Sequence, residues 1–414
     1  MIATQTWAVL VDAYRELNAK KLFWITMGLS LLVVLAFAAV GINEKGMSIL
    51  WWTMEIEAFN STIMDPADFY KLTFTSLGVG IWLTWVATIL ALVSTASMIP
   101  DMLASGSIEL VLARPIARTR LFLTKYIAGL LFVFLQVLVF SVASFLVIGI
   151  RGGVWEPGLF LAVPVVTLFF SYLFGLCTLF GVVTRSAIAA LLMTLLVWFL
   201  TFALNTTEIV LLTEKTRAEM SADRHALVLD DTRPKVVALE EELAGLEAQV
   251  AAGDLAEDDA AIRKLRSRIK AGNAYIARIE TDAPKHASSA KTIAKWHRMI
   301  FGVKTALPKT AETTELLNRW LVDAANLPSG PAERPTEDKD FAEFLGASAG
   351  AAEGGESGAA PKRPQSVRVS QSEVQRALQD VIRSRSVAWV VGTSLLFEAL
   401  CVGLAAFLFK RRDF

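Results

Sequence analysis

The sequence predicts an all-α polytopic membrane protein, in which six transmembrane helices carry a large helical insertion between the fifth and the sixth. The 414 residues are 54% hydrophobic and only 19% charged, and the mean hydropathy is +0.49. Such a composition is typical of membrane proteins. Six apolar runs are long enough to cross a hydrocarbon core about 30 Å thick. Most charged residues instead lie within 205–386, between the last two runs, which predicts a separate polar domain there.

The first 204 residues are expected to contain an amphipathic interfacial helix and five spans. Residues 1–21 place apolar side chains at helical spacing opposite charged ones, which is typical of a helix along a membrane surface. A helix packed on a cytoplasmic partner is the alternative. Pro100 is expected to end the second run, because proline lacks a backbone donor and clashes inside a helix. Arg185 is expected to cap the tight turn after the fourth span. The five spans are expected at 22–42, 72–99, 121–150, 157–183 and 186–204.

The polar block is expected to form an extracytoplasmic helical domain, a linker and a short helix. In the domain, 205–327, apolar residues recur in steps of three and four on two stretches, which predicts an antiparallel coiled-coil hairpin at 235–280. This hairpin either reaches an extracytoplasmic accessory protein or a second copy, or packs on its own domain. Residues 328–370 are rich in Gly, Ala, Pro and Ser and predict a disordered linker. Ser370 and Glu373 have capping-box spacing for an amphipathic helix at 371–386, followed by the sixth span and its tail at 387–414.

The distribution of basic residues in the short segments predicts the orientation. Lys and Arg of short loops accumulate on the cytoplasmic side of a membrane. Alternating the spans places both termini in the cytoplasm and residues 205–386 outside it. A plasma (inner) membrane of a prokaryote is the expected location. The basic residues on the expected inner side are Arg15, Lys20, Lys21, Arg114, Arg118, Arg120, Arg185, Lys410, Arg411 and Arg412, against Lys45, Lys71 and Arg151 outside.

The segment between the second and third spans, expected as a cytoplasmic loop at 100–120, has the pattern of a short amphipathic helix. A polar turn around Ser105 leads into an amphipathic stretch at 108–113, which Arg114-Pro115 ends, because the residue before proline is disfavoured in helical conformation. Such a short helix between two spans could transmit force to both. The alternative is an ordinary charged loop that the basic residues hold on the inner side.

This segment resembles the permease subunits of the type-2 ABC exporter family, in which an acidic residue, a Gly-Thr-like pair, leucines and a Pro-(Ile/Leu)-x-Arg element separate these spans. Ser107 stands where Thr is usual, and Asp101 where Glu is common. The resemblance implies a coupling helix that docks on a separate cytoplasmic ATPase, which binds the ATP and Mg²⁺. It also implies a second permease, either another copy of this chain or a paired permease. The contact residues that it implies are Asp101, Gly106, Ser107, Ile108, Glu109, Val111, Leu112, Arg114, Pro115, Arg118 and Lys125.

No enzymatic site is predicted in the chain itself. The sequence has no GxxxxGK[ST] phosphate loop, and its three histidines and two cysteines have no metal-ligand spacing. With 40 basic and 40 acidic residues, nothing indicates a nucleic-acid partner. We therefore expect no bound cofactor, and the lipid bilayer is the remaining expected partner.

Two polar residues are expected within the membrane, Gln136 in the third span and Glu398 in the middle of the sixth. An ionised carboxylate at that depth costs roughly 2.5–3.5 kcal/mol on insertion scales, so Glu398 must face other helices or a wet cavity. It serves either as a pathway or gating group or as an interhelical hydrogen-bond partner of a residue such as Gln136. Two other functions remain open: an ion-coupled carrier using Glu398, and a membrane-anchored scaffold whose hairpin recruits partners.

Overall fold

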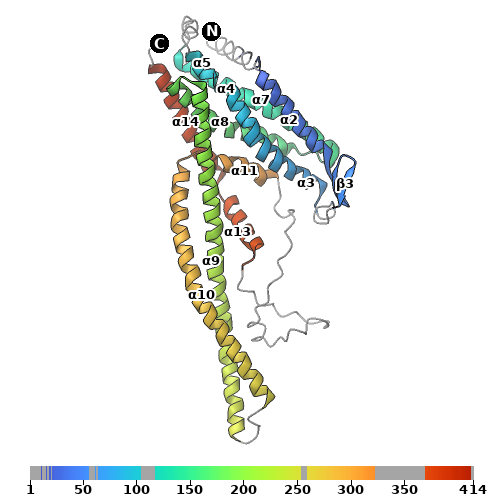
Figure 1. Cartoon of the computed structure of the whole chain (residues 1–414), viewed down its shortest axis with the longest axis vertical. Coiled ribbons are helices and arrows are strands. Elements are labelled where there is room, and N and C mark those ends of the chain that lie inside the picture. Colours follow the sequence, from blue (N-terminus) through green and yellow to red (C-terminus); the bar gives the residue numbers. More distant parts are fainter. Residues whose placement is uncertain are drawn as a thin grey trace. The chain divides into compact units, whose positions relative to one another are not determined.

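The computed structural model describes residues 21–55, 64–103, 117–252, 259–321 and 369–411, together with residues 11, 15, 18, 19 and 61. The chain divides into two compact units (Figure 1). The span unit comprises Met1–Thr206, Gly302–Pro328 and Arg385–Phe414, and the hairpin unit comprises Thr207–Phe301 and Ser329–Ser384. Among the described residues, six helices are long and apolar enough to cross a membrane, in agreement with the six spans expected from the sequence.

The first span, α2 (Lys21–Ala39), is followed by a three-stranded antiparallel sheet that the all-α prediction missed. Its strands are β1 (Val40–Asn43), β2 (Gly46–Ile49) and β3 (Trp52–Glu55). The expected first span ran to residue 42, but β1 already begins at Val40. The turn between β1 and β2 needs the positive φ of Gly46, 138°, which a residue with a side chain rarely adopts.

The second candidate span, Pro66–Leu103, consists of four consecutive helices. They are α3 (Pro66–Thr73), the π-helix η1 (Phe74–Ala87), α4 (Thr88–Thr95) and α5 (Met98–Leu103). The expectation that Pro100 ends the helical run was wrong. The run is interrupted after Thr95, and Pro100 lies in the first turn of α5, where the missing backbone N–H has no intrahelical partner to lose.

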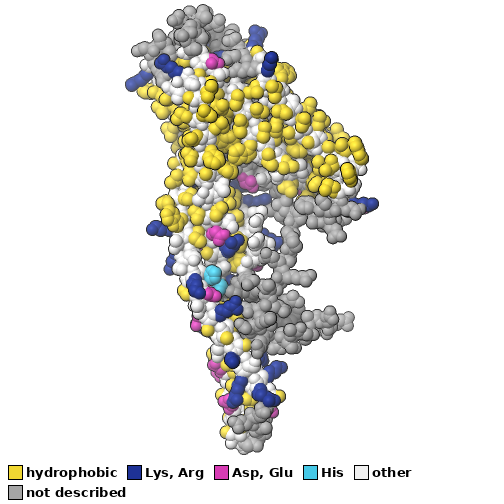
Figure 2. Space-filling view, in the orientation of Figure 1, with side chains coloured by type: hydrophobic (Ala, Val, Ile, Leu, Met, Phe, Trp, Pro, Cys, Tyr) yellow, Lys and Arg dark blue, Asp and Glu magenta, His cyan; other side chains and the backbone are white. Residues whose placement is uncertain are grey.

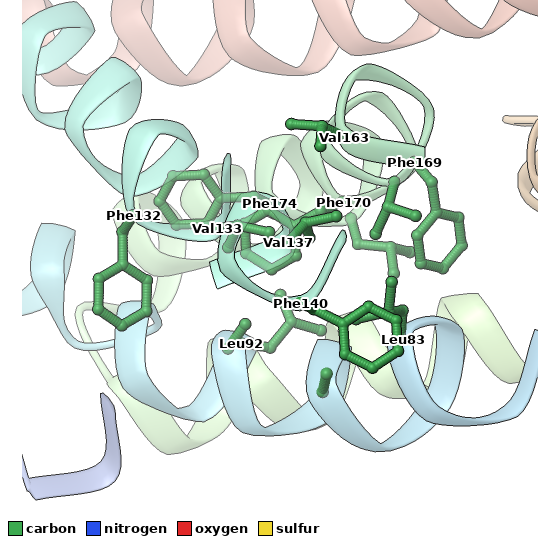
Figure 3. Packing of buried hydrophobic residues seen from close by; sticks show 14 of the residues in the cluster. Leu83, Leu92, Phe132, Val133, Val137, Phe140, Val163, Phe169, Phe170 and Phe174 are labelled. Carbon is green, nitrogen blue, oxygen red and sulfur yellow. The ribbon is translucent and has the colours of Figure 1, made fainter. Parts of the chain in front are cut away.

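The fourth span, α8 (Ala162–Thr184), is preceded by the 3₁₀ turn η2 (Pro157–Leu161) and is the most buried of the six candidate spans. The third and sixth spans, α7 (Arg118–Gly152) and α14 (Val387–Arg411), both pack against α8. Figure 3 shows labelled phenylalanines of α7 and α8 gathered with Leu83 and Leu92 of the second span. Figure 2 shows that the visible outer face of the spans is hydrophobic, as lipid contact requires. As predicted, Arg185 caps α8: its φ is 55° and its amide donates to the Gly181 carbonyl oxygen at 3.0 Å.

The fifth span was expected to end near residue 204, and the helix that contains it, α9 (Ala187–Ala251), continues without a break past that point. The boundary between the two units falls within α9, between Thr206 and Thr207, so its second part belongs to the hairpin unit. There it lies antiparallel to α10 (Ala260–Thr305) (Figure 1). Glu247 accepts a hydrogen bond from Arg266 at 2.8 Å, and much farther along the two helices His297 lies 3.2 Å from Glu208. The helices of the predicted hairpin are therefore present, but their contact extends well beyond 235–280.

Two shorter helices complete the described chain. In α13 (Gln371–Arg383) both bonds of the predicted capping box are present between Ser370 and Glu373. α11 (Thr310–Leu321) belongs to the span unit, not to the helical domain expected at 205–327. Its apolar face, Leu316, Leu317 and Leu321, is buried against α8 and neighbouring elements. Most of the expected interfacial helix at 1–21, and all but two residues of the linker expected at 328–370, lie outside the described residues.

Candidate functional site

The carboxylate of Glu398 lies at a junction of three spans in the middle of α14. Its Oε1 is 2.7 Å from the hydroxyl of Tyr126 on α7, and its Oε2 is 2.7 Å from the hydroxyl of Ser171 on α8. Gly175 allows α8 and α14 to approach here, because a Cβ at this position would lie 3.3 Å from Val402 and 3.5 Å from the Glu398 side chain. The site therefore ties α7, α8 and α14 together through one side chain.

The two hydroxyls also have backbone acceptors within reach. Tyr126 Oη lies 3.0 Å from the Ser171 carbonyl oxygen, and Ser171 Oγ lies 2.8 Å from that of Leu168. A hydroxyl carries a single proton. Each hydroxyl can therefore donate its proton either to Glu398 or to a backbone carbonyl oxygen. A movement of α7 or α14 would change the distances to these two acceptors and so the favoured hydrogen bond. The network is sensitive to the relative position of the three helices.

Glu398 makes interhelical hydrogen bonds, one of the two roles considered for it, but with Tyr126 and Ser171 and not with Gln136, which was named as an example of a partner. Gln136 lies ten residues after Tyr126 on α7, and its side chain is only 6% exposed. It lines a small cavity with Thr26 and Ser30 of α2 and Thr88 of α4. The centre of a water molecule can reach about 10 Å³ of it, which is close to the space that one buried water needs. Within the described part of the chain, Gln136 Nε2 has no hydrogen-bond partner.

Of the residues expected to contact an ATPase, the structure describes Asp101, Arg118 and Lys125. Asp101 lies on α5, and the other two lie on the first turns of α7. The remaining eight, together with the amphipathic stretch, fall within residues 104–116, outside the described residues. They are Gly106, Ser107, Ile108, Glu109, Val111, Leu112, Arg114 and Pro115.

Both flanks of the 104–116 segment are anchored in the span core. On α5, Met98, Ile99, Met102 and Leu103 are buried, and the helix packs against α8 and α7. On α7, Phe122 is fully buried and its ring lies 5.8 Å from that of Phe409 near the end of α14. Tyr126 follows Arg118 by eight residues, about 12 Å along the helix. The helix that leaves the segment therefore carries one of the two hydroxyls that bind Glu398.

A second polar cluster, which the sequence analysis missed, is centred on Glu312 of α11. Its Oε1 accepts from Lys304 Nζ and, at 3.0 Å, from Arg385 Nη1. Lys304 also donates to Asn205 Oδ1. The side chains of Glu312 and Lys304 are each 6% exposed, and that of Arg385 is 11% exposed. We call these four residues the junction cluster.

All four residues of the junction cluster belong to the span unit. Asn205, Lys304 and Arg385 each stand within three residues of a sequence boundary of this unit, and Glu312 links two of these residues directly. No local pattern could reveal this, because the members are spread over 181 positions of sequence, from 205 to 385. The cluster therefore joins, within the span unit, three stretches of chain that lie next to its sequence boundaries.

Lys309, next to the junction cluster, is buried beneath Trp389. Its Nζ lies 4.6 Å from the centre of the indole ring and donates to the carbonyl oxygens of Thr305 and Leu307 at 3.0 and 3.3 Å. Burial lowers the pKa of this ammonium to about 8, although the nearby carboxylate of Glu312 acts in the opposite direction. Its backbone N–H donates to Ser394 of α14 at 2.9 Å, which fixes the start of α11 to the sixth span.

All three histidines lie in the hairpin unit, where two of them, His225 and His286, face each other with ring centres 4.9 Å apart. Among the described residues, no group of three His, Cys, Asp or Glu side chains is arranged to hold a metal ion.

Comparison of the chain with protein-family models, with curated proteins and with solved structures found no match.

Proposed function

We propose that this chain is the membrane-spanning permease subunit of an ATP-driven exporter of the type-2 ABC kind. The observation that carries the proposal is the pattern at positions 101–125, from Asp101 through Arg114-Pro115 to Lys125, placed between two apolar helices. ATP and Mg²⁺ would be bound by a separate cytoplasmic ATPase, and this chain would not itself be an enzyme.

The anchored flanks support a mechanical role for the 104–116 segment. A force applied there reaches α5 and α7, which both pack against α8. Packed interiors do not deform continuously, so such a force moves a helix as a body or not at all. A shift of α7 would act on the Tyr126–Glu398–Ser171 network, where the hydrogen bonds join all three spans. In this proposal, docking of the ATPase changes the hydrogen bonds of this network in the middle of the bundle.

The arrangement of the whole transporter follows from the same proposal. Two permease copies would pair within a prokaryotic plasma membrane with both termini in the cytoplasm. The hairpin unit would then lie on the outer side, where it could contact an extracytoplasmic accessory protein.

The experiment compares two variants that each add one negative charge to the 104–116 segment. Leu112→Asp places a carboxylate on the apolar side expected to enter the ATPase, and burying an unpaired charge there costs several kcal/mol. Ser105→Asp places the same charge in the polar turn and serves as the control. Affinity-tagged protein is purified in detergent from its native cells, and vanadate-sensitive ATP hydrolysis is measured in the eluate.

We expect the wild type and Ser105→Asp to retain a subunit with a GxxxxGK[ST] sequence and its hydrolysis, and Leu112→Asp to lose both while still inserting in the membrane. Equal association and hydrolysis in all three proteins would contradict the coupling proposal.

An ion-coupled carrier is the second candidate, favoured by the carboxylate of Glu398 and its two hydroxyl partners. The two candidates differ in their energy source. Transport that persists after ATP depletion but stops in Glu398→Gln would favour the carrier; loss of transport on ATP depletion would favour the exporter. A scaffold would show transport under neither condition.

A further inference from the structure

The turn between β2 and β3 and the first residue of β3 expose large apolar side chains. Trp51 is 88% exposed, Trp52 is 75% exposed and Leu50 is 57% exposed. Met54, 51% exposed, lies two residues farther along β3, opposite Met47. At the opposite end of the sheet, the β1–β2 turn carries Glu44 and Lys45. The sheet is therefore apolar at one end and charged at the other.

The register of the sheet places its apolar end at the end of the first span. Val40 pairs with Ile49, and the amide of Leu50 donates to the carbonyl oxygen of Ala39, the last residue of α2, at 2.6 Å. The β1–β2 turn begins after four strand residues, roughly 13 Å along the chain at 3.3 Å each. The tryptophans thus return to the point where the chain leaves the span, and the charged turn lies away from it.

The length of α2 locates that point relative to a bilayer. Its 19 residues span about 28 Å, close to the thickness of a hydrocarbon core. The apolar surface of α2, which includes Leu31, Leu32 and Leu35 at 55–60% exposure, leads along the helix to this end. The exposed tryptophans therefore continue a lipid-facing surface at the depth where indole rings are enriched in membrane proteins.

The sheet is held firmly enough to present this turn. The hydroxyl of Tyr70 on α3 donates to the Val40 carbonyl oxygen at 3.1 Å. Gly41 is closely covered, because a Cβ there would lie 2.9 Å from Ser48 Oγ and 3.2 Å from Arg151 Nη2. Leu50 has a φ of 55°, a strained conformation for leucine that persists only where surrounding contacts impose it.

We propose that the β2–β3 turn with its flanking pair, residues 49–52, is an interfacial anchor that binds the boundary between headgroups and acyl chains of the bilayer. The lipid surface is favoured over a second copy of the chain because the turn continues the exposed face of a span at its end. The proposal does not depend on the transport function. Its effect is to fix the depth of the sheet, and of α2, in the membrane.

The test places a fluorophore at graded positions along the sheet. Trp51→Cys, Met54→Cys and Lys45→Cys are made in a chain with Cys177→Ala and Cys401→Ala, labelled with the polarity-sensitive dye NBD and reconstituted into phosphatidylcholine vesicles. A nitroxide on the acyl chain near the headgroup then quenches dyes at the membrane boundary. Lys45→Cys is the matched control, because it lies on the same sheet at its charged end.

We expect the dye at position 51 to show blue-shifted emission and to lose most of its fluorescence to the nitroxide lipid. The dye at 54 should be quenched less and the dye at 45 hardly at all. Equal quenching at 51 and 45, or water-like emission at 51, would overturn the proposal. A dye at 51 that is shielded from water, insensitive to the nitroxide lipid and self-quenched at high labelling would assign the turn to contact between copies and would also overturn it.

Discussion

Replacing Glu312 by glutamine should destabilise the span unit more than any other single change of charge that we propose. Glutamine keeps the shape of the side chain but removes the charge that Lys304 and Arg385 share. Each hydrogen bond to a charged group contributes about 1.5–3 kcal/mol, so two of them contribute roughly 3–6 kcal/mol. Breaking a buried ion pair by removing one partner costs about 3–5 kcal/mol, because the remaining charge stays in a poorly hydrated site. The free energy of unfolding is therefore expected to fall by about 4 kcal/mol in Glu312→Gln.

The assay is unfolding of the purified protein in detergent, followed by the fluorescence of its tryptophans. Glu315→Gln is the matched control, because Glu315 lies on the same helix and its bond to Asn318, at 2.8 Å, is exposed. Surface changes of this kind usually alter the free energy of unfolding by less than about 0.5 kcal/mol. If the free energy of unfolding falls no more in Glu312→Gln than in Glu315→Gln, the junction cluster does not stabilise the span unit, and the reasoning is refuted.

Three further predictions concern Lys309, Arg185 and Ser370. Burial lowers the pKa of Lys309 to about 8, so between pH 8 and its unfolded value near 10.4 the unfolded chain binds more protons than the folded one. The stability of the wild type relative to Lys309→Met should therefore rise as the pH increases through 8, and a difference that falls or stays constant in thermal unfolding would contradict this. Arg185→Gly should raise the free energy of unfolding by up to about 1 kcal/mol, because glycine adopts the φ of 55° without strain; a clear loss would mean that the arginine side chain matters more than its backbone. Ser370→Ala should weaken α13 by about 1 kcal/mol by removing its N-cap, and unchanged amide hydrogen exchange in α13 would count against it.

The spans could be predicted because twenty apolar residues in a row have few alternatives to a membrane helix. The capping box at Ser370 and the turn at Arg185 were predictable for a similar reason, since each depends on a few neighbouring residues. The sheet could not be predicted in this way. Its strands have four residues each, and β1 directly continues the apolar run of α2, so the hydropathy pattern does not show where the helix ends.

Features that local sequence patterns do not specify account for the other differences between the expected and the observed structure. The pairing of Glu398 with Tyr126 and Ser171 depends on how α7, α8 and α14 are rotated, which a single sequence does not specify. The continuation of α9 past residue 204 was missed because a change from apolar to polar composition was taken as a boundary, although no helix-breaking residue follows it there. Glu312 was missed because its partners are distant in sequence.

The most direct test of the central claim, that the segment at 104–116 faces the cytoplasm and the hairpin faces the other side, is thiol accessibility in intact cells. Single cysteines are introduced as Ser105→Cys and Ala248→Cys; the two native cysteines, Cys177 and Cys401, are both buried and should contribute little background. A membrane-impermeant maleimide should label Ala248→Cys from outside the cell and Ser105→Cys only after the membrane is opened. Labelling of Ser105→Cys in intact cells with protection of Ala248→Cys would reverse the topology and contradict the proposed docking of a cytoplasmic ATPase.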